Sequence, residues 1–188
     1  VEFSPEMEGM FDRFSNILTP EQLEQMRNAT MPVHPFFLTI VQGLIAGITI
    51  NAVAGFGEEL GWRGLMLKEL SYLGFWKTSW ITGLVWGIWH APVIMMGHNF
   101  PDHPMAGVVM MIIFCILISP FFTLVALRSG STIAVAVLHG SFNALSGVAV
   151  LLLKGGNDLL TGVTGAAGMA VLVVLNLVIL KFTRTGNR

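Results

Sequence analysis

Long apolar runs separated by short polar segments fill the chain from about residue 36 onward. A helix needs about 20 apolar residues to cross the roughly 30 Å hydrocarbon core of a bilayer. The pattern predicts five such spans, at 36–56, 75–97, 105–127, 132–153 and 159–182. We therefore expect an all-α, polytopic transmembrane helix bundle with its core at 36–188.

Residues 1–35 follow a different pattern. Met and Phe side chains recur at helical spacing between Ser4 and Leu18, with Ser4 as a candidate N-cap, which predicts an amphipathic helix. Thr19 followed three residues later by Gln22 is typical of a capping box and predicts a second helix that ends near Asn28. We expect 1–35 to be an amphipathic, extramembrane helical segment on the membrane surface. The chain begins with a Val and has no signal-peptide pattern, so we expect a fragment whose upstream spans are missing.

Composition supports a membrane protein: 54% of the residues are hydrophobic, 11% are charged and the mean hydropathy is +0.73. Soluble domains carry roughly 25% charged residues. The net charge of -1 and the lack of a basic cluster argue against nucleic acid as a partner, and membrane lipid is the expected surrounding. Cys115 is the single cysteine, so no disulfide framework is predicted.

Basic residues predict the orientation, because Lys and Arg prefer the cytoplasmic ends of short loops. They cluster after the first, third and fifth spans, at Arg63, Lys68, Lys77, Arg128, Lys181, Arg184 and Arg188. This alternation places the C-terminus in the cytoplasm, and we expect a multi-pass protein of a prokaryotic cell membrane. Small residues also recur four apart, which permits close helix packing, at Gly43/Gly47, Gly83/Gly87 and Gly140/Ala144.

Two carboxylates and a guanidinium stand at the end of the first apolar run. Ionisable residues inside a membrane cost at least ~2.5 kcal/mol each and usually serve a function. Glu58 and Glu59 project about 100° apart on a helix, so they face different surroundings. Glu59 lies four residues before Arg63, the favourable spacing for an ion pair. We assign Glu59 and Arg63 a supporting role and Glu58 the reactive one.

Histidines interrupt two further spans. Trp86 and His90 are four apart in the second span, and His139 and Asn143 are four apart in the fourth, so each pair shares a helix face. Counted at 1.5 Å per residue from the basic residue at each cytoplasmic end, Glu58, His90 and His139 lie roughly 15, 20 and 17 Å deep. Either histidine alone is more often a packing residue with a hydrogen-bond partner. Convergence of three spans at one depth instead predicts a site.

Three motifs carry a family resemblance: Glu58-Glu59-x-x-x-Arg63, Trp86-x-x-x-His90 and His139-x-x-x-Asn143. They resemble the EExxxR, FxxxH and HxxxN/B motifs of the CPBP family, the CAAX proteases and bacteriocin-processing or self-immunity proteins also called Abi. The resemblance covers about 36–150 and differs at Trp86, where the motif name has Phe. It implies an all-helical intramembrane endopeptidase, a hydrolase of membrane-associated proteins or peptides, with a site open toward the cytoplasm.

Two mechanisms fit these residues. In the first, Glu58 with His90 activates water and returns the proton, while His139 and Asn143 donate to the oxyanion; Glu59, Arg63 and Trp86 support them. In the second, Glu58, His90 and His139 bind a zinc-like metal, as the common label metalloprotease suggests. The sequence does not choose between a metal cofactor and a metal-independent glutamate mechanism.

Two other functional classes stay open. A non-catalytic membrane immunity or binding protein would use the same residues to join helices, and a proton-coupled transporter would use them as a relay. Under the protease interpretation, the substrate is a prenylated CAAX-type protein or a bacterial peptide. His98 and His103, which flank Asp102 in a predicted loop, are expected to be solvated loop residues.

Overall fold

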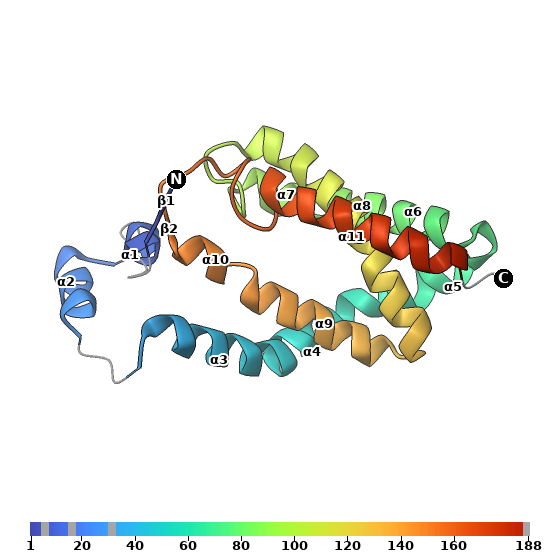
Figure 1. Cartoon of the computed structure of the whole chain (residues 1–188), viewed down its shortest axis with the longest axis horizontal. Coiled ribbons are helices and arrows are strands. Elements are labelled where there is room, and N and C mark those ends of the chain that lie inside the picture. Colours follow the sequence, from blue (N-terminus) through green and yellow to red (C-terminus); the bar gives the residue numbers. More distant parts are fainter. Residues whose placement is uncertain (5–7, 15–17, 30–32, 186–188) are drawn as a thin grey trace.

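The computed structural model describes residues 1–4, 8–14, 18–29 and 33–185, and helices account for most of them (Figure 1). This confirms the expected all-α membrane bundle. Its helical elements are α1 (Glu8–Phe14), α2 (Pro20–Asn28), α3 (Pro35–Ile48), α4 (Ile50–Glu59), the π-helical stretch η1 (Leu60–Met66), α5 (Leu67–Glu69), the 3₁₀ turn η2 (Ser71–Leu73), α6 (Phe75–Trp89), α7 (Ala91–Met95), α8 (Pro104–Ser129), α9 (Thr132–Leu145), α10 (Val148–Leu151) and α11 (Ala166–Thr185).

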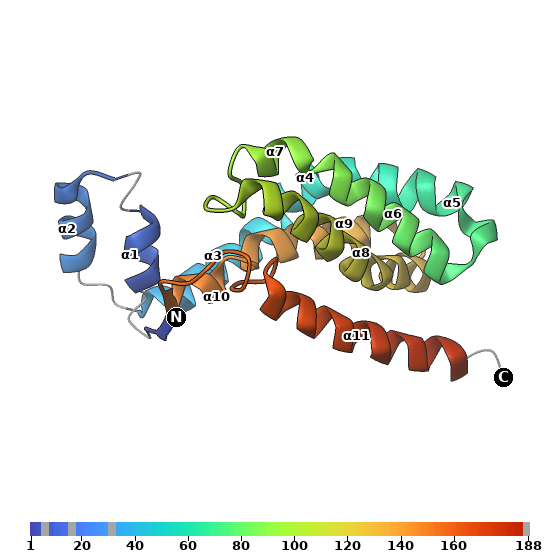
Figure 2. The same ribbon diagram turned by 90° about the horizontal axis from the view of Figure 1, so that it is seen from above.

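The helices form two packed groups. In one, α9 runs along α3 and α4; in the other, α6 packs against α8 (Figure 1). η1 contacts α6, α8 and α9, so the segment that carries Arg63 bridges the two groups. α11 lies along α8 and otherwise stands apart from the bundle (Figure 2). Contacts with η1 therefore bring together α4, α6 and α9, the helices that carry the polar motifs.

Glycines bring the helix backbones of each group together. A Cβ atom on Gly140 of α9 would overlap the backbone of Gly47 and Ala52, where α3 passes into α4. A Cβ atom on Gly83 or Gly87 of α6 would overlap the backbone of α8. The close packing predicted from small residues four apart is confirmed at these positions.

The first apolar run is bent rather than straight. The axes of Pro35–Ile48 and Ile50–Glu69 differ by 45°. Thr49 sits at the bend with φ −114° and ψ −99°, outside the helical region, and its hydroxyl donates to the carbonyl of Ile45 at 2.6 Å. The helix continues past Glu58, but through the π-helical stretch, where the amide of Leu67 donates to the carbonyl of Trp62.

Fewer helices than the predicted five have the length to cross a membrane. By length and composition, two of the described helices qualify, Pro104–Ser129 and Ala166–Thr183, or three if the bent pair counts as one span. The predicted span 75–97 is split into α6 and α7, because Pro92 has no amide hydrogen to continue the helix. The predicted span 132–153 ends at Leu145.

The N-terminal segment is attached to the bundle. Its capping box is confirmed: Thr19 Oγ1 accepts from the amide of Gln22 at 3.3 Å, and the amide of Thr19 donates to Gln22 Oε1 at 2.9 Å. Two-residue strands, β1 (Glu2–Phe3) and β2 (Leu153–Lys154), pair antiparallel and add a small β element to the predicted helices. Parts of the predicted first helix, 5–7 and 15–17, lie outside the described residues.

Candidate active site

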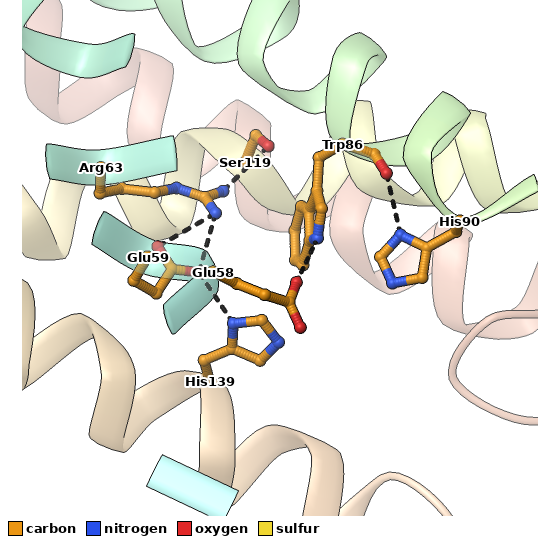
Figure 3. A network of polar contacts seen from close by, with 7 residues as sticks. All are labelled: Glu58, Glu59, Arg63, Trp86, His90, Ser119 and His139. Atoms are coloured by element: carbon orange, nitrogen blue, oxygen red, sulfur yellow. Dashed lines mark hydrogen bonds and ion pairs between the residues drawn. The ribbon is translucent and has the colours of Figure 1, made fainter. Parts of the chain in front are cut away.

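Glu59 is the most enclosed member of the polar cluster. Its side chain is 0% exposed, and Arg63 Nη1 donates to its Oε1 at 3.0 Å and to its Oε2 at 3.2 Å (Figure 3). The Nδ1 of His139, on α9, lies 2.8 Å from the same Oε1. The ion pair that the spacing predicts is therefore present, and it also fixes the ring of His139.

Arg63 is held from a second side by α8. Its Nη2 donates to Ser119 Oγ at 3.0 Å, and its guanidinium lies 4.8 Å from the ring centroids of both Trp86 and Phe122. A buried guanidinium needs such partners, because a charge without them is expensive to bury. Sequence analysis missed Ser119 and Phe122. The only signal was a serine before Pro120 in an otherwise apolar run.

Glu58 has different surroundings from Glu59. It is half-buried, and its Oε2 accepts from the indole Nε1 of Trp86 at 2.9 Å. Its carboxylate lies between the indole of Trp86 and the ring of His139 (Figure 3). Within the described part of the chain, the indole is its one hydrogen-bond donor, so its other oxygen is available to a water molecule or a substrate.

The hydrogen bonds of the two histidines determine which ring nitrogens can react. His90 Nδ1 lies 2.9 Å from the carbonyl oxygen of Trp86, and His139 Nδ1 lies on the Glu59 carboxylate. Both partners only accept, so we assign the proton to Nδ1 in each ring. When either ring is neutral, its Nε2 then carries a lone pair.

Not all predicted site residues are joined directly. Glu58, Glu59, Arg63, Trp86 and His139 form one connected cluster of hydrogen bonds and ring contacts. His90 joins it through Trp86, by the backbone hydrogen bond and a ring contact at 5.6 Å. Asn143, one turn beyond His139 on α9, is exposed and makes no side-chain hydrogen bond in the described part of the chain.

A cavity of about 360 Å³ adjoins this cluster. His90 and Asn143 both line it, together with apolar side chains from α8 and α9, Met111, Phe114 and Phe142. His90 and Asn143 thus line the same cavity, at the end of the bundle where α6 ends and α7 begins.

The predicted metal ligands do not form a metal site in this arrangement. No three His, Cys, Asp or Glu side chains of the described residues could hold one ion, and this includes the set Glu58, His90 and His139. Trp86 contacts both Glu58 and His90, with its indole on the carboxylate and its carbonyl on the imidazole. The chemistry below is therefore derived from the side chains alone.

Comparisons with known proteins identify the family to which the chain belongs. No curated protein and no solved structure matches it. The sequence model of one family, described as type II CAAX prenyl endopeptidase Rce1-like, matches residues 35–145, which is more than half of the chain and includes all three motifs. This is a family of proteases, and the apolar helices agree with an integral membrane protein. The chain belongs to the Rce1-like family of type II CAAX prenyl endopeptidases.

Proposed function

We propose that this protein hydrolyses peptide bonds of membrane-associated proteins or peptides, including prenylated CAAX-type substrates, with water activated by Glu58 and His90. The observation that carries the proposal is the state of Glu58: its carboxylate is half-buried in an apolar bundle, and one oxygen is held by Trp86 while the other is available. A general base needs such a position, within hydrogen-bond reach of water yet shielded from bulk solvent. The family match supports the substrate class.

The first step is attack by water. Glu58, assisted by His90 Nε2, removes one proton from a water molecule as its oxygen bonds to the scissile carbonyl carbon. The product of this step is a tetrahedral oxyanion, with the proton on the Glu58 carboxyl or the His90 ring. That proton then passes to the departing amide nitrogen as the C–N bond breaks, giving a carboxylic acid and an amine; the acid then passes its proton to the amine, which leaves a carboxylate and an ammonium group.

The oxyanion needs donors, and His139 and Asn143 supply them in this proposal. Since His139 Nδ1 is committed to Glu59, the ring can donate from Nε2 only as an imidazolium, which holds a proton on each nitrogen. Asn143, whose amide has no partner in the described part of the chain, is available to donate when substrate enters.

Orientation in the membrane is a separate part of the proposal. The distribution of Lys and Arg supports a cytoplasmic C-terminus. The cavity, however, is lined by the loops after α7 and after α10, which the same distribution assigns to the opposite side. A cytoplasmic opening, as the family resemblance implies, therefore conflicts with the charge pattern. Reporter enzymes fused after Arg188, active on one side of the membrane only, decide between the two.

The test of activity is Glu58→Gln. The amide oxygen still accepts from Trp86 Nε1, but the side chain no longer takes a proton. We expect at least ~100-fold lower cleavage of a prenylated reporter peptide, because a general base contributes about that much or more. Glu69→Gln, an exposed carboxylate on α5, is the matched control. Equal cleavage by wild type and Glu58→Gln would rule out the proposed role. Comparing the membrane proteomes of cells that express each variant identifies natural substrates.

A further inference from the structure

The cavity beside His90 and Asn143 has two walls made of loops. His98 and Asn99 belong to the loop between α7 and α8, and the other wall is formed by 158–164, the segment that leads into α11. This second wall lies outside the part of the chain that the family model matches, residues 35–145. The three motifs therefore give no account of what holds it beside the active site.

Asp158 joins the two walls. Its Oδ1 lies 2.6 Å from His103 Nδ1, and its Oδ2 accepts from the backbone amide of Asp102 at 2.9 Å. The carboxylate is 11% exposed and the His103 ring 40%, and Asp158 itself lines the cavity. We call these two hydrogen bonds the Asp158 latch. His103, expected to be a solvated loop residue, is instead one of its two partners.

The Asp158 carboxylate carries a negative charge in the latch. Burial raises the pKa of Asp158, but the hydrogen bonds from the His103 ring and from the backbone of Asp102 together outweigh burial and hold the pKa below its usual range. The carboxylate is therefore ionised at neutral pH, and hydrogen bonds to a charged acceptor are stronger than neutral ones. Asn157 adds local order, because its side chain accepts from the amide of Leu159 at 2.8 Å.

We propose that the cavity binds the extended stretch of substrate peptide next to the scissile bond, including one apolar side chain of that stretch. The Asp158 latch positions the 158–164 wall of this cavity. This inference rests on the proposed function. The apolar surface comes from Met111, Phe114 and Phe142. The volume of about 360 Å³ is at the lower end for ligand pockets, about 300 to 1,000 Å³, and suits a side chain rather than a folded domain. Asp158 is a positioning residue, since it acts through the wall.

The first experiment measures the wall without using activity. Thr164→Cys places a thiol in the cavity lining, and the natural Cys115 is fully buried and gives a low background. Adding Asp158→Ala should raise the rate of maleimide modification of the purified protein by roughly 5-fold or more, because local opening governs access to a covered site. Asp102→Asn is the matched control: it removes the same charge from the neighbouring loop but keeps the backbone amide that Asp158 binds.

The second experiment measures substrate binding. With a prenylated reporter peptide, Asp158→Ala should raise KM about 5-fold and leave kcat within about 2-fold, as expected for a loss of binding equivalent to one or two hydrogen bonds. Asp158→Asn keeps an acceptor for the Asp102 amide and should restore part of the effect. If the alanine variant does not fold, the KM of Asp158→Asn is measured in its place. A purely structural role would lower kcat and the amount of folded protein instead.

The outcomes separate the latch from the proposed function. Unchanged modification of Thr164→Cys after Asp158→Ala, or an equal increase with Asp102→Asn, overturns the latch. An opened wall with an unchanged KM in an active enzyme overturns the assignment of the cavity to substrate. If wild type cleaves nothing while Asp158→Ala still opens the wall, the latch is supported, and the proposed function fails together with the substrate assignment.

Discussion

Glu58 and Glu59 are neighbours in the chain, yet their carboxylates lie in different surroundings. Glu59 is enclosed by Arg63 and His139, whereas Glu58 accepts one hydrogen bond, from Trp86, and stays half-buried. The helix turns by about 100° per residue, which is enough to direct one side chain into the bundle and the other toward the open side. One carboxylate is thus fixed by an ion pair, and the other is held through one oxygen only.

Removal of one partner of the Glu59–Arg63 pair should destabilise the protein strongly. Glu59→Gln leaves Arg63 without a counter-charge in a buried position, and breaking such pairs costs about 3 to 5 kcal/mol. The double variant Glu59→Leu/Arg63→Met removes both charges and should lose less than the sum of the single changes. Unfolding of the detergent-solubilised protein measures both. Strictly additive losses would show that the two side chains are energetically independent.

Trp86→Phe tests the hydrogen bond to Glu58 separately from the aromatic ring. The phenyl ring can still lie against the Arg63 guanidinium, but the donor to Glu58 Oε2 is lost. We expect roughly 10-fold lower kcat/KM, because one hydrogen bond to a charged group is worth about 1.5 kcal/mol. Trp80→Phe, at an exposed position of α6, is the control. An unchanged rate would mean that the indole does not orient Glu58.

Ser119→Ala examines the residue of α8 that sequence analysis missed. The change leaves Arg63 Nη2 buried without its acceptor, which costs about 1 to 3 kcal/mol. The control is Ser129→Ala, whose hydroxyl bonds the carbonyl of Val125 at an exposed position. Chemical unfolding of both variants provides the comparison. Equal stability of Ser119→Ala and wild type would show that Ser119 does not help to hold Arg63.

Gly140→Ala should separate the helices that hold His139. The added methyl group would overlap the backbone of Gly47 and Ala52, so α9 must move away from the bend between α3 and α4. Overpacking of this kind costs about 1 to 3 kcal/mol, and displacement of His139 should lower kcat as well. Gly57→Ala, where a Cβ meets nothing within 4 Å, should be nearly silent. Retained activity and stability in Gly140→Ala would contradict the close packing.

Exhaustive chelation should leave cleavage intact. The expectation follows from the arrangement of Glu58, His90 and His139, which among the described residues do not form a group that could hold one ion. Elemental analysis of the purified, active protein provides the second measurement. Loss of activity on chelation, restored by a divalent cation, would show that these side chains rearrange around a metal in the working enzyme.

The sequence was most informative where spacing alone sets the geometry. A separation of four residues predicted the contact of Glu59 with Arg63, and the capping box of α2 follows from Thr19 and Gln22. Contacts between segments far apart in sequence were not predictable in this way. Asp158 reaches a histidine 55 positions away, and a lone aspartate in a glycine-rich loop gives no signal of its partner. The bend at Thr49 likewise lies where Gly140 of α9 packs against the backbone of Gly47 and Ala52, a contact that periodicity does not report.

The π-helical stretch Leu60–Met66 makes the enzyme sensitive to chain length at this point. A π turn is an α-helix with one additional residue, because each hydrogen bond spans five positions instead of four. Deletion of Gly64 would restore a regular helix and rotate Glu59 by about 100° relative to α5. Natural relatives should therefore tolerate many substitutions at the exposed positions here, such as Leu60 and Leu65, but no insertion or deletion between Glu59 and Leu67.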